Sequence, residues 1–289
     1  MTGTPAIASR IFRRFADLRA SGEMGIVAYI TAGDPSLEAT LKFVLALAEG
    51  GADVIELGVP FSDPLADGPT IQRASERALK SGTGLGGVLA MVHSIRKQSD
   101  VPLVLFSYYN PVLQMGLEKF GHFAKAAGAD GVLITDLTPE ESDDYLRVMR
   151  SNKLDTIFLA APTSDDDRLR KISAASSGFL YLISRTGVTG AKDALPDDLP
   201  ALLRRTRTFT NLPVAVGFGI SLPGHVSVLG GLADAAVVGS ALVSEIEKAT
   251  AQDSSSAASD AAARALSAKI RSLKEAALAG LSRRSEVAP

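Results

Sequence analysis

The chain contains 289 residues, of which 46% are hydrophobic and 21% charged, with a formal net charge of −2 and no cysteine. The near-neutral charge argues against a nucleic-acid-binding protein, and the lack of cysteine excludes disulfides, thiolate catalysis and cysteine-ligated metals. This length fits one large α/β barrel domain or two smaller domains.

The sequence contains no clear export signal or membrane-spanning segment. Its first residues, MTGTPAIASRIFRRF, lack the basic-then-apolar order of a signal peptide. The most apolar stretch, 212–243, is interrupted by Pro213, Pro223 and several glycines. Because its apolar pieces are short, two buried strands explain it better than a transmembrane helix. We therefore expect a soluble protein with no membrane partner.

Short apolar or β-branched runs alternate with segments of helical spacing along the chain. The intervening segments, such as SLEATLKFVLALAEGG, often begin with Ser, Thr or Asp and end at Gly or Asn, which are helix start and stop signals. Eight runs are predicted to be strands: Ile26–Thr31, Val54–Gly58, Leu103–Ser107, Gly131–Thr135, Thr156–Ala160, Phe179–Ser184, Val214–Gly217 and Ala235–Val238.

Uniformly apolar strands that alternate with helices indicate a parallel sheet covered by helices. Eight such units in about 250 residues predict an α/β fold of the closed (β/α)8 TIM barrel type. The alternative is an open doubly wound sheet, but no G-x-G-x-x-G motif stands at the first strand–helix junction. Residues 1–250 are predicted to form the catalytic barrel. Residues 251–289 are predicted to form an Ala/Ser-rich connection and an extra C-terminal helix, packed on or extending from the barrel.

Two acidic residues mark the end of the second predicted strand. Glu56 lies within VIELG, and Asp67 follows in the loop PFSDPLADGP. Taken singly, Glu56 is equally well explained as a buried structural acid and Asp67 as a turn cap. Together they are more informative, because a barrel strand and its loop deliver both carboxylates to the mouth where chemistry occurs.

Glycines follow the last two predicted strands. GFGIS at 217–221 follows strand seven, and VVGSALV at 237–243 leads strand eight directly into a helix. Glycine is also common in tight turns, but loops after strands seven and eight of barrels often bind phosphate at a helix N-terminus. We therefore expect a phosphate site there. The long loop RTGVTGAKDALPDDLP after strand six is interpreted as a mobile lid or a simple connection.

The absence of certain residues at the predicted strand ends disfavours two kinds of catalytic site. No predicted strand contains a lysine, which disfavours a Schiff-base aldolase. The three histidines, His93, His122 and His225, lie in helical segments and form no metal-binding pair, so no metal site is expected.

Several motifs resemble those of the tryptophan synthase alpha subunit family. IELGVPFSDPLADGPTIQ is similar to the family signature nearly residue for residue. YITAGDP, YYNP, ISRTGVTGA, VGFGIS and VVGSALV also match, in the family's order, from about residue 9 to residue 247. The resemblance implies a (β/α)8 barrel lyase of L-tryptophan biosynthesis. It would cleave indole-3-glycerol phosphate to indole and glyceraldehyde 3-phosphate by retro-aldol acid/base catalysis.

The resemblance also implies partners and residue roles. Glu56 corresponds to the catalytic acid/base, and Asp67 to the carboxylate that accepts a hydrogen bond from the indole N–H. The remaining implied roles concern the substrate pocket (Tyr29, Tyr181, Thr189, Phe218), the phosphate site (Gly190, Gly219, Gly239, Ser240) and the partner interface (Asp63, Asn110). Tyr29 stands where the family is expected to have phenylalanine.

The implied assembly contains two alpha and two beta chains. The indole passes to a beta subunit that carries pyridoxal phosphate, whereas this chain needs no cofactor or metal. The implied location is the cytoplasm, or a plastid-like compartment if a longer precursor exists.

Two rival functions remain. The first is another phosphate-binding barrel such as indole-3-glycerol phosphate synthase, which relies on a strand lysine that this chain lacks. The second is a non-catalytic activator of a beta partner, which would need neither Glu56 nor Asp67.

Overall fold

Nine parallel strands form one sheet in the order β5-β4-β3-β2-β1-β9-β8-β7-β6. The computed structural model describes residues 9–184, 195–217, 219–251 and 255–285, with side chains as far as residue 280. The strands are β1 (Gly25–Thr31), β2 (Val54–Gly58), β3 (Leu103–Ser107), β4 (Gly131–Ile134), β5 (Asp155–Ile157), β6 (Leu159–Ala160), β7 (Leu180–Ile183), β8 (Val214–Gly217) and β9 (Ala235–Val238).

The fifth predicted strand is divided at Phe158. Its first half, β5, pairs with β4, and its second half, β6, pairs with β7. The Phe158 carbonyl accepts a hydrogen bond from the Tyr181 N–H at 3.2 Å, so pairing continues across the break. Because β5 and β6 are consecutive in the chain, the sheet closes on itself. The predicted (β/α)8 barrel is therefore confirmed.

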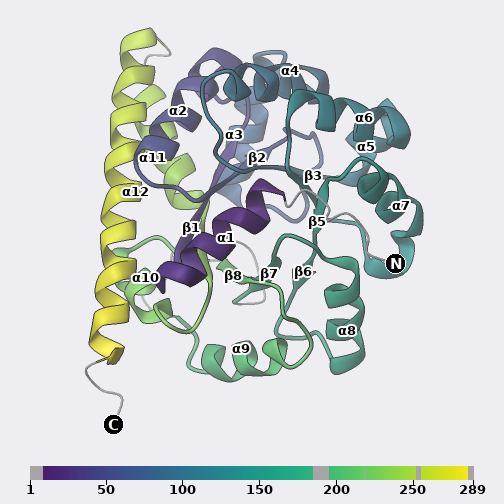
Figure 1. The fold of residues 1–289 in the computed structure, drawn as a ribbon. Coiled ribbons are helices and arrows are strands. Elements are labelled where there is room, and N and C mark those ends of the chain that lie inside the picture. Colours follow the sequence, from purple (N-terminus) through teal and green to yellow (C-terminus); the bar gives the residue numbers. More distant parts are fainter. Residues whose placement is uncertain (1–8, 185–194, 218, 252–254, 286–289) are drawn as a thin grey trace.

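Helices surround the barrel (Figure 1). Local capping starts several of them, since Ser9, Ser36 and Asp165 each accept a backbone N–H in the first turn. The helices are α1 (Arg10–Ser21), α2 (Leu37–Glu49), α3 (Pro69–Lys80), α4 (Leu85–Arg96), α5 (Tyr109–Met115), α6 (Leu117–Ala127), α7 (Asp143–Ser151), α8 (Asp166–Ala175), α9 (Leu199–Arg207), α10 (Pro223–Leu229), α11 (Ser240–Thr250) and α12 (Ser256–Ser285), with a 3-10 turn at Pro139–Glu141.

The extra C-terminal helix α12 runs along one side of the barrel, where it packs against α2, α10 and α11 (Figure 1). Its buried face carries apolar residues such as Leu266, Ile270 and Leu273. Lys274 Nζ reaches the Asp53 carboxylate at 2.6 Å, next to the start of β2. The helix thus covers barrel elements that are distant from it in the sequence. In the part of the chain that the structure describes, no helix is both long and apolar enough to span a membrane.

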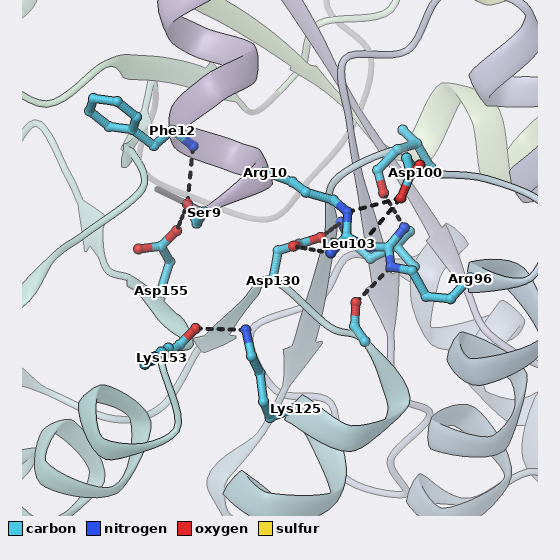
Figure 2. A network of polar contacts seen from close by, with 12 residues as sticks. Ser9, Arg10, Phe12, Arg96, Asp100, Leu103, Lys125, Asp130, Lys153 and Asp155 are labelled. Atoms are coloured by element: carbon cyan, nitrogen blue, oxygen red, sulfur yellow. Dashed lines mark hydrogen bonds and ion pairs between the residues drawn. The ribbon is translucent and has the colours of Figure 1, made fainter. Parts of the chain in front are cut away.

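Helix α1 closes the end of the barrel at which the strands begin. Its residues Ile11, Phe15 and Leu18 are buried against the inward-facing strand side chains. Arg10 donates to Asp130 at 3.1 Å, and Ser9 donates to Asp155 at 2.5 Å (Figure 2). This end is therefore filled, and the opposite end is left for a binding site.

The acids at the closed end are structural. Asp53 accepts the Ile26 N–H at 2.6 Å. Asp130 accepts the Leu103 N–H at 2.9 Å (Figure 2). Each also has a cationic partner, such as Arg96, which donates to Asp130 at 2.6 Å. These buried carboxylates have the hydrogen bonds that burial of a charge requires.

Candidate active site

Glu56 points into the barrel from the centre of β2. Its parallel neighbours are Tyr29 on β1 and Val104 on β3, and its side chain is fully buried. Neither carboxyl oxygen has a hydrogen-bond partner in the described part of the chain. Burial raises the pKa of Glu56 to about 8. The group is therefore protonated near neutral pH and can both donate and accept a proton.

Asp67 lies in the loop that follows β2, and its side chain is buried. Tyr108 Oη donates a hydrogen bond to Asp67 Oδ2 at 3.0 Å and accepts one from the Ala66 N–H at 2.9 Å. Burial raises the pKa of Asp67 to about 6, and the hydrogen bond from Tyr108 opposes this rise. Asp67 is thus more acidic than Glu56, and at neutral pH the two carboxyl groups favour different charge states.

Both carboxyl groups line one cavity at the open end of the barrel, as expected for a strand and its loop. Among the predicted residues that the structure describes, the cavity is also lined by Tyr29, Tyr181, Gly219, Gly239 and Ser240. Thr189, Gly190 and Phe218 lie outside the described residues. Sequence reasoning missed the remaining lining residues, which are mainly apolar: Ala66, Ile71, Phe106, Thr135, Leu159, Ile183, Ile220 and Val237.

Two tyrosines line the cavity, and each lies against a glycine. A Cβ atom on Gly58 would lie 2.2 Å from Tyr29 Oη, and one on Gly217 would lie 2.2 Å from Tyr181 Oη. The Tyr29 ring also meets Phe106 edge to face, with 5.1 Å between centroids. The two glycines therefore make room for aromatic rings inside the barrel.

The carboxyl groups also affect the tyrosines. Burial raises the pKa of Tyr29, and the nearby Asp67 raises it further. Burial likewise raises the pKa of Tyr181, with Glu56 as the next contribution. Both tyrosines consequently remain neutral and keep a hydroxyl that can donate a hydrogen bond.

The glycines after β8 and β9 lie on the same cavity as the acids. Gly219 has a φ of 77°, a left-handed conformation that side chains other than glycine rarely adopt. Gly239 directly precedes α11, which begins at Ser240 without a side-chain cap. The first N–H groups of a helix have no intrahelical partner, and they attract anions together with the helix dipole. The geometry suits a phosphate in the cavity that the two carboxyl groups also line.

The two predicted interface residues lie on the outer surface. Asp63 is exposed in the loop after β2 and accepts a hydrogen bond from Ser62 Oγ at 2.6 Å. Asn110 is exposed on α5. Neither lines the cavity. In the loop that contains Asp63, Leu65 is 93% exposed.

Tyr108 was missed as a site residue, although it lies directly after the third predicted strand. That position at a strand end was the available signal. Its hydroxyl is aimed at Asp67 across an interval of 41 residues, which no local pattern encodes. Within the described residues there is no cluster of three or more side chains suited to a metal ion.

Comparison with known proteins agrees with this geometry. The family model described as "Tryptophan synthase alpha chain" matches residues 15–276. The alpha chain of Solibacter usitatus is 52% identical over 240 residues, which cover 83% of this chain and 90% of that protein. The alpha chain of Geobacter sulfurreducens is 49% identical over 245 residues, covering 85% and 93% of the two chains.

Solved structures show the same similarity. The tryptophan synthase subunit alpha of Legionella pneumophila superimposes with a TM-score of 0.84 at 36% identity, covering 96% of this chain and 99% of that chain. A chain of the Pyrococcus furiosus tryptophan synthase complex gives a TM-score of 0.77 at 40% identity, covering 87% and 97%. On the strength of the family model and these relatives, the chain belongs to the tryptophan synthase alpha chain family.

Proposed function

We propose that Glu56 is the acid and base of the reaction of this family, the cleavage of indole-3-glycerol phosphate to indole and glyceraldehyde 3-phosphate. The chain is a carbon–carbon lyase of L-tryptophan biosynthesis. Protonated Glu56 gives its proton to the indole ring carbon that bears the glycerol chain. The resulting carboxylate then removes the proton of the hydroxyl on the adjacent carbon. The carbon–carbon bond breaks, its electrons return to the ring, and an aldehyde forms.

The observation that carries this proposal is the state of the Glu56 carboxyl. It is fully buried and has no hydrogen-bond partner among the described residues, whereas the structural acids Asp53 and Asp130 have both N–H and cationic partners. A structural acid would be expected to have such partners. An unpartnered acid with a pKa of about 8 is suited to proton transfer near neutral pH.

We assign Asp67 the electrostatic role. Its lower pKa of about 6 leaves it ionised at neutral pH, so it can accept a hydrogen bond from the indole N–H. Protonation at the ring carbon makes the ring cationic, and a nearby carboxylate stabilises that charge as it develops. The hydrogen bond from Tyr108 holds the carboxylate in place.

The remaining substrate contacts follow the same geometry. Tyr29 and Tyr181 would hold the indole and glycerol parts, and Gly219, Gly239 and Ser240 would hold the phosphate. The resemblance adds Phe218 to the indole pocket, Gly190 to the phosphate site and Thr189 as a lid residue that engages Asp67.

The chain works with a beta subunit, and the alpha chain of this family binds no cofactor itself. We propose that pyridoxal phosphate belongs to the beta chain, which receives the indole, and that Asp63 and Asn110 contribute to the contact in an α2β2 assembly. The exposed position of both residues is compatible with such a contact. We assign the assembly to the cytoplasm, or to a plastid-like compartment if a longer precursor exists.

Measuring indole release from indole-3-glycerol phosphate, with and without a beta subunit, tests the proposal. Glu56→Gln should reduce turnover by about 10²- to 10⁴-fold, the usual contribution of a general acid/base. Near-normal turnover of this variant would refute the role of Glu56. A wild-type chain that releases no indole but activates the beta subunit would identify a regulatory subunit instead. Indole-3-glycerol phosphate synthase is disfavoured, since none of the nine described strands contains a lysine.

A further inference from the structure

Four charged side chains outside the cavity connect three elements that carry site residues. Arg73 donates to both oxygens of Glu247, at 2.7 Å each. Arg77 donates to both oxygens of Asp34 at 2.8 Å, and also to Glu247 Oε1 at 2.8 Å. We call Asp34, Arg73, Arg77 and Glu247 the bridging cluster. Paired geometry of this kind fixes orientation as well as distance.

Each member of the cluster lies on, or shortly after, an element with a role in the site. Arg73 and Arg77 lie on α3, which begins at Pro69 just after Asp67. Glu247 lies on α11, which begins at Ser240 beside the phosphate site. Asp34 follows β1, which carries Tyr29. The cluster therefore joins the part of the protein that would hold the indole to the part that would hold the phosphate.

Helices α3 and α11, which these ion pairs join, also share an apolar contact with β1. Ile71 and Ala74 of α3 are buried together with Val243 of α11 and Tyr29 of β1. Ile71 and Tyr29 also line the cavity. A shift of α3 relative to α11 would thus be transmitted to the cavity wall.

We propose that Arg73, Arg77, Glu247 and Asp34 are positioning residues, which hold the start of α11 at a fixed distance from the Asp67 loop so that one substrate spans both. This inference rests on the proposed function. None of the four residues lines the cavity, so they act through the elements that they join. A substrate that lacks the phosphate would not use this fixed distance.

The four residues of the bridging cluster differ in how much their replacement would destabilise the fold. Asp34 is 1% exposed, so removing Arg77 would leave a buried carboxylate without its cation. Glu247 is 25% exposed, and its hydrogen bonds from Arg73 are the main cause that lowers its pKa to about 2. Replacing Glu247 with glutamine removes the ionic link between α3 and α11 and leaves the Arg77–Asp34 pair in place. Glu247→Gln is therefore the informative variant.

The test compares two substrates on the full-length chain: indole-3-glycerol phosphate and indoleglycerol, which lacks the phosphate. Glu247→Gln should reduce kcat/KM for the phosphorylated substrate about tenfold, mainly through KM, and change that for indoleglycerol less than about twofold. Arg73→Gln should also lower kcat/KM selectively for the phosphorylated substrate, but by a smaller factor. It replaces Glu247→Gln in the test if that variant does not fold. Glu247→Asp should recover part of the loss.

Glu140→Gln is the matched control. Glu140 also accepts from two cations of a neighbouring helix, Arg168 at 2.5 Å and Lys171 at 3.1 Å, but it does not line the cavity. This control should leave the ratio of the two kcat/KM values unchanged. Equal losses for both substrates in Glu247→Gln, or no loss for either, would overturn the positioning role. Failure of the proposed function would appear separately, as near-normal turnover of Glu56→Gln.

Discussion

The pKa of Glu56 makes stability depend on pH in a direction opposite to that of most carboxyl groups. The folded-state pKa is about 8 and the reference value is 4.5, so between these values the folded chain binds more protons than the unfolded chain. Stability contributed by this group therefore falls as pH rises from 4.5 to 8. Below pH 4.5 the group is protonated in both states. Above pH 8 it is ionised in both states, and the free energy of unfolding is reduced by the full cost of burying the charge.

The size of the effect follows from the shift. Each pKa unit corresponds to about 1.4 kcal/mol, so raising the pH from 5 to 8 should cost the wild type about 4 kcal/mol through Glu56 alone. Glu56→Gln removes the titrating group while keeping a side chain of similar size. The variant should lose correspondingly less stability over the same interval.

Urea unfolding followed by far-UV circular dichroism, at several pH values from 5 to 8.5, measures this difference. The slope of unfolding free energy against pH should be less negative in Glu56→Gln than in the wild type. Comparing slopes cancels any constant cost of burying the amide. Parallel slopes for the two proteins would refute the assignment of a raised pKa to Glu56. They would also remove the physical basis for its role as a proton donor at neutral pH.

Three further predictions concern the cavity. Tyr108→Phe removes the hydrogen bond that lowers the pKa of Asp67. The rise of kcat/KM with pH should therefore move to higher pH. An unchanged pH profile would argue against that contact. Gly58→Ala should destabilise the chain by about 1–3 kcal/mol in thermal unfolding, because its Cβ would meet the Tyr29 hydroxyl. Adding Tyr29→Phe removes the nearest atom and should recover part of that loss, and no recovery would show that the hydroxyl is not the main source of the clash. Ser240→Glu places a carboxylate at a helix start, where it favours the helix but repels phosphate. The KM for indole-3-glycerol phosphate should rise on the order of tenfold in steady-state assays, and an unchanged KM would place the phosphate elsewhere.

The strand pattern and the family resemblance predicted that Glu56, Asp67, Gly219 and Gly239 share one end of the barrel, and these residues line one cavity. Parallel strands of a barrel all end at the same mouth, so Glu56 within a strand and Asp67 in the next loop had to approach one another. The same rule brought Gly219 and Gly239, which follow other strands, to that mouth. The break of the fifth strand at Phe158 was not visible, because the run TIFLA is apolar after its first residue and contains no glycine or proline.

The sequence by itself determined the barrel, because apolar periodicity, helix caps and turn residues are local properties of the chain. It also determined which chemical groups reach the open end, since this depends only on their order along the strands. Only the tertiary structure decided their environment: that Glu56 has no hydrogen-bond partner among the described residues, that Tyr108 bonds Asp67, and that Glu247 is joined to Arg73 across 174 residues. Burial and pairing of this kind arise from contacts between distant segments, and those contacts exist only once the barrel has closed.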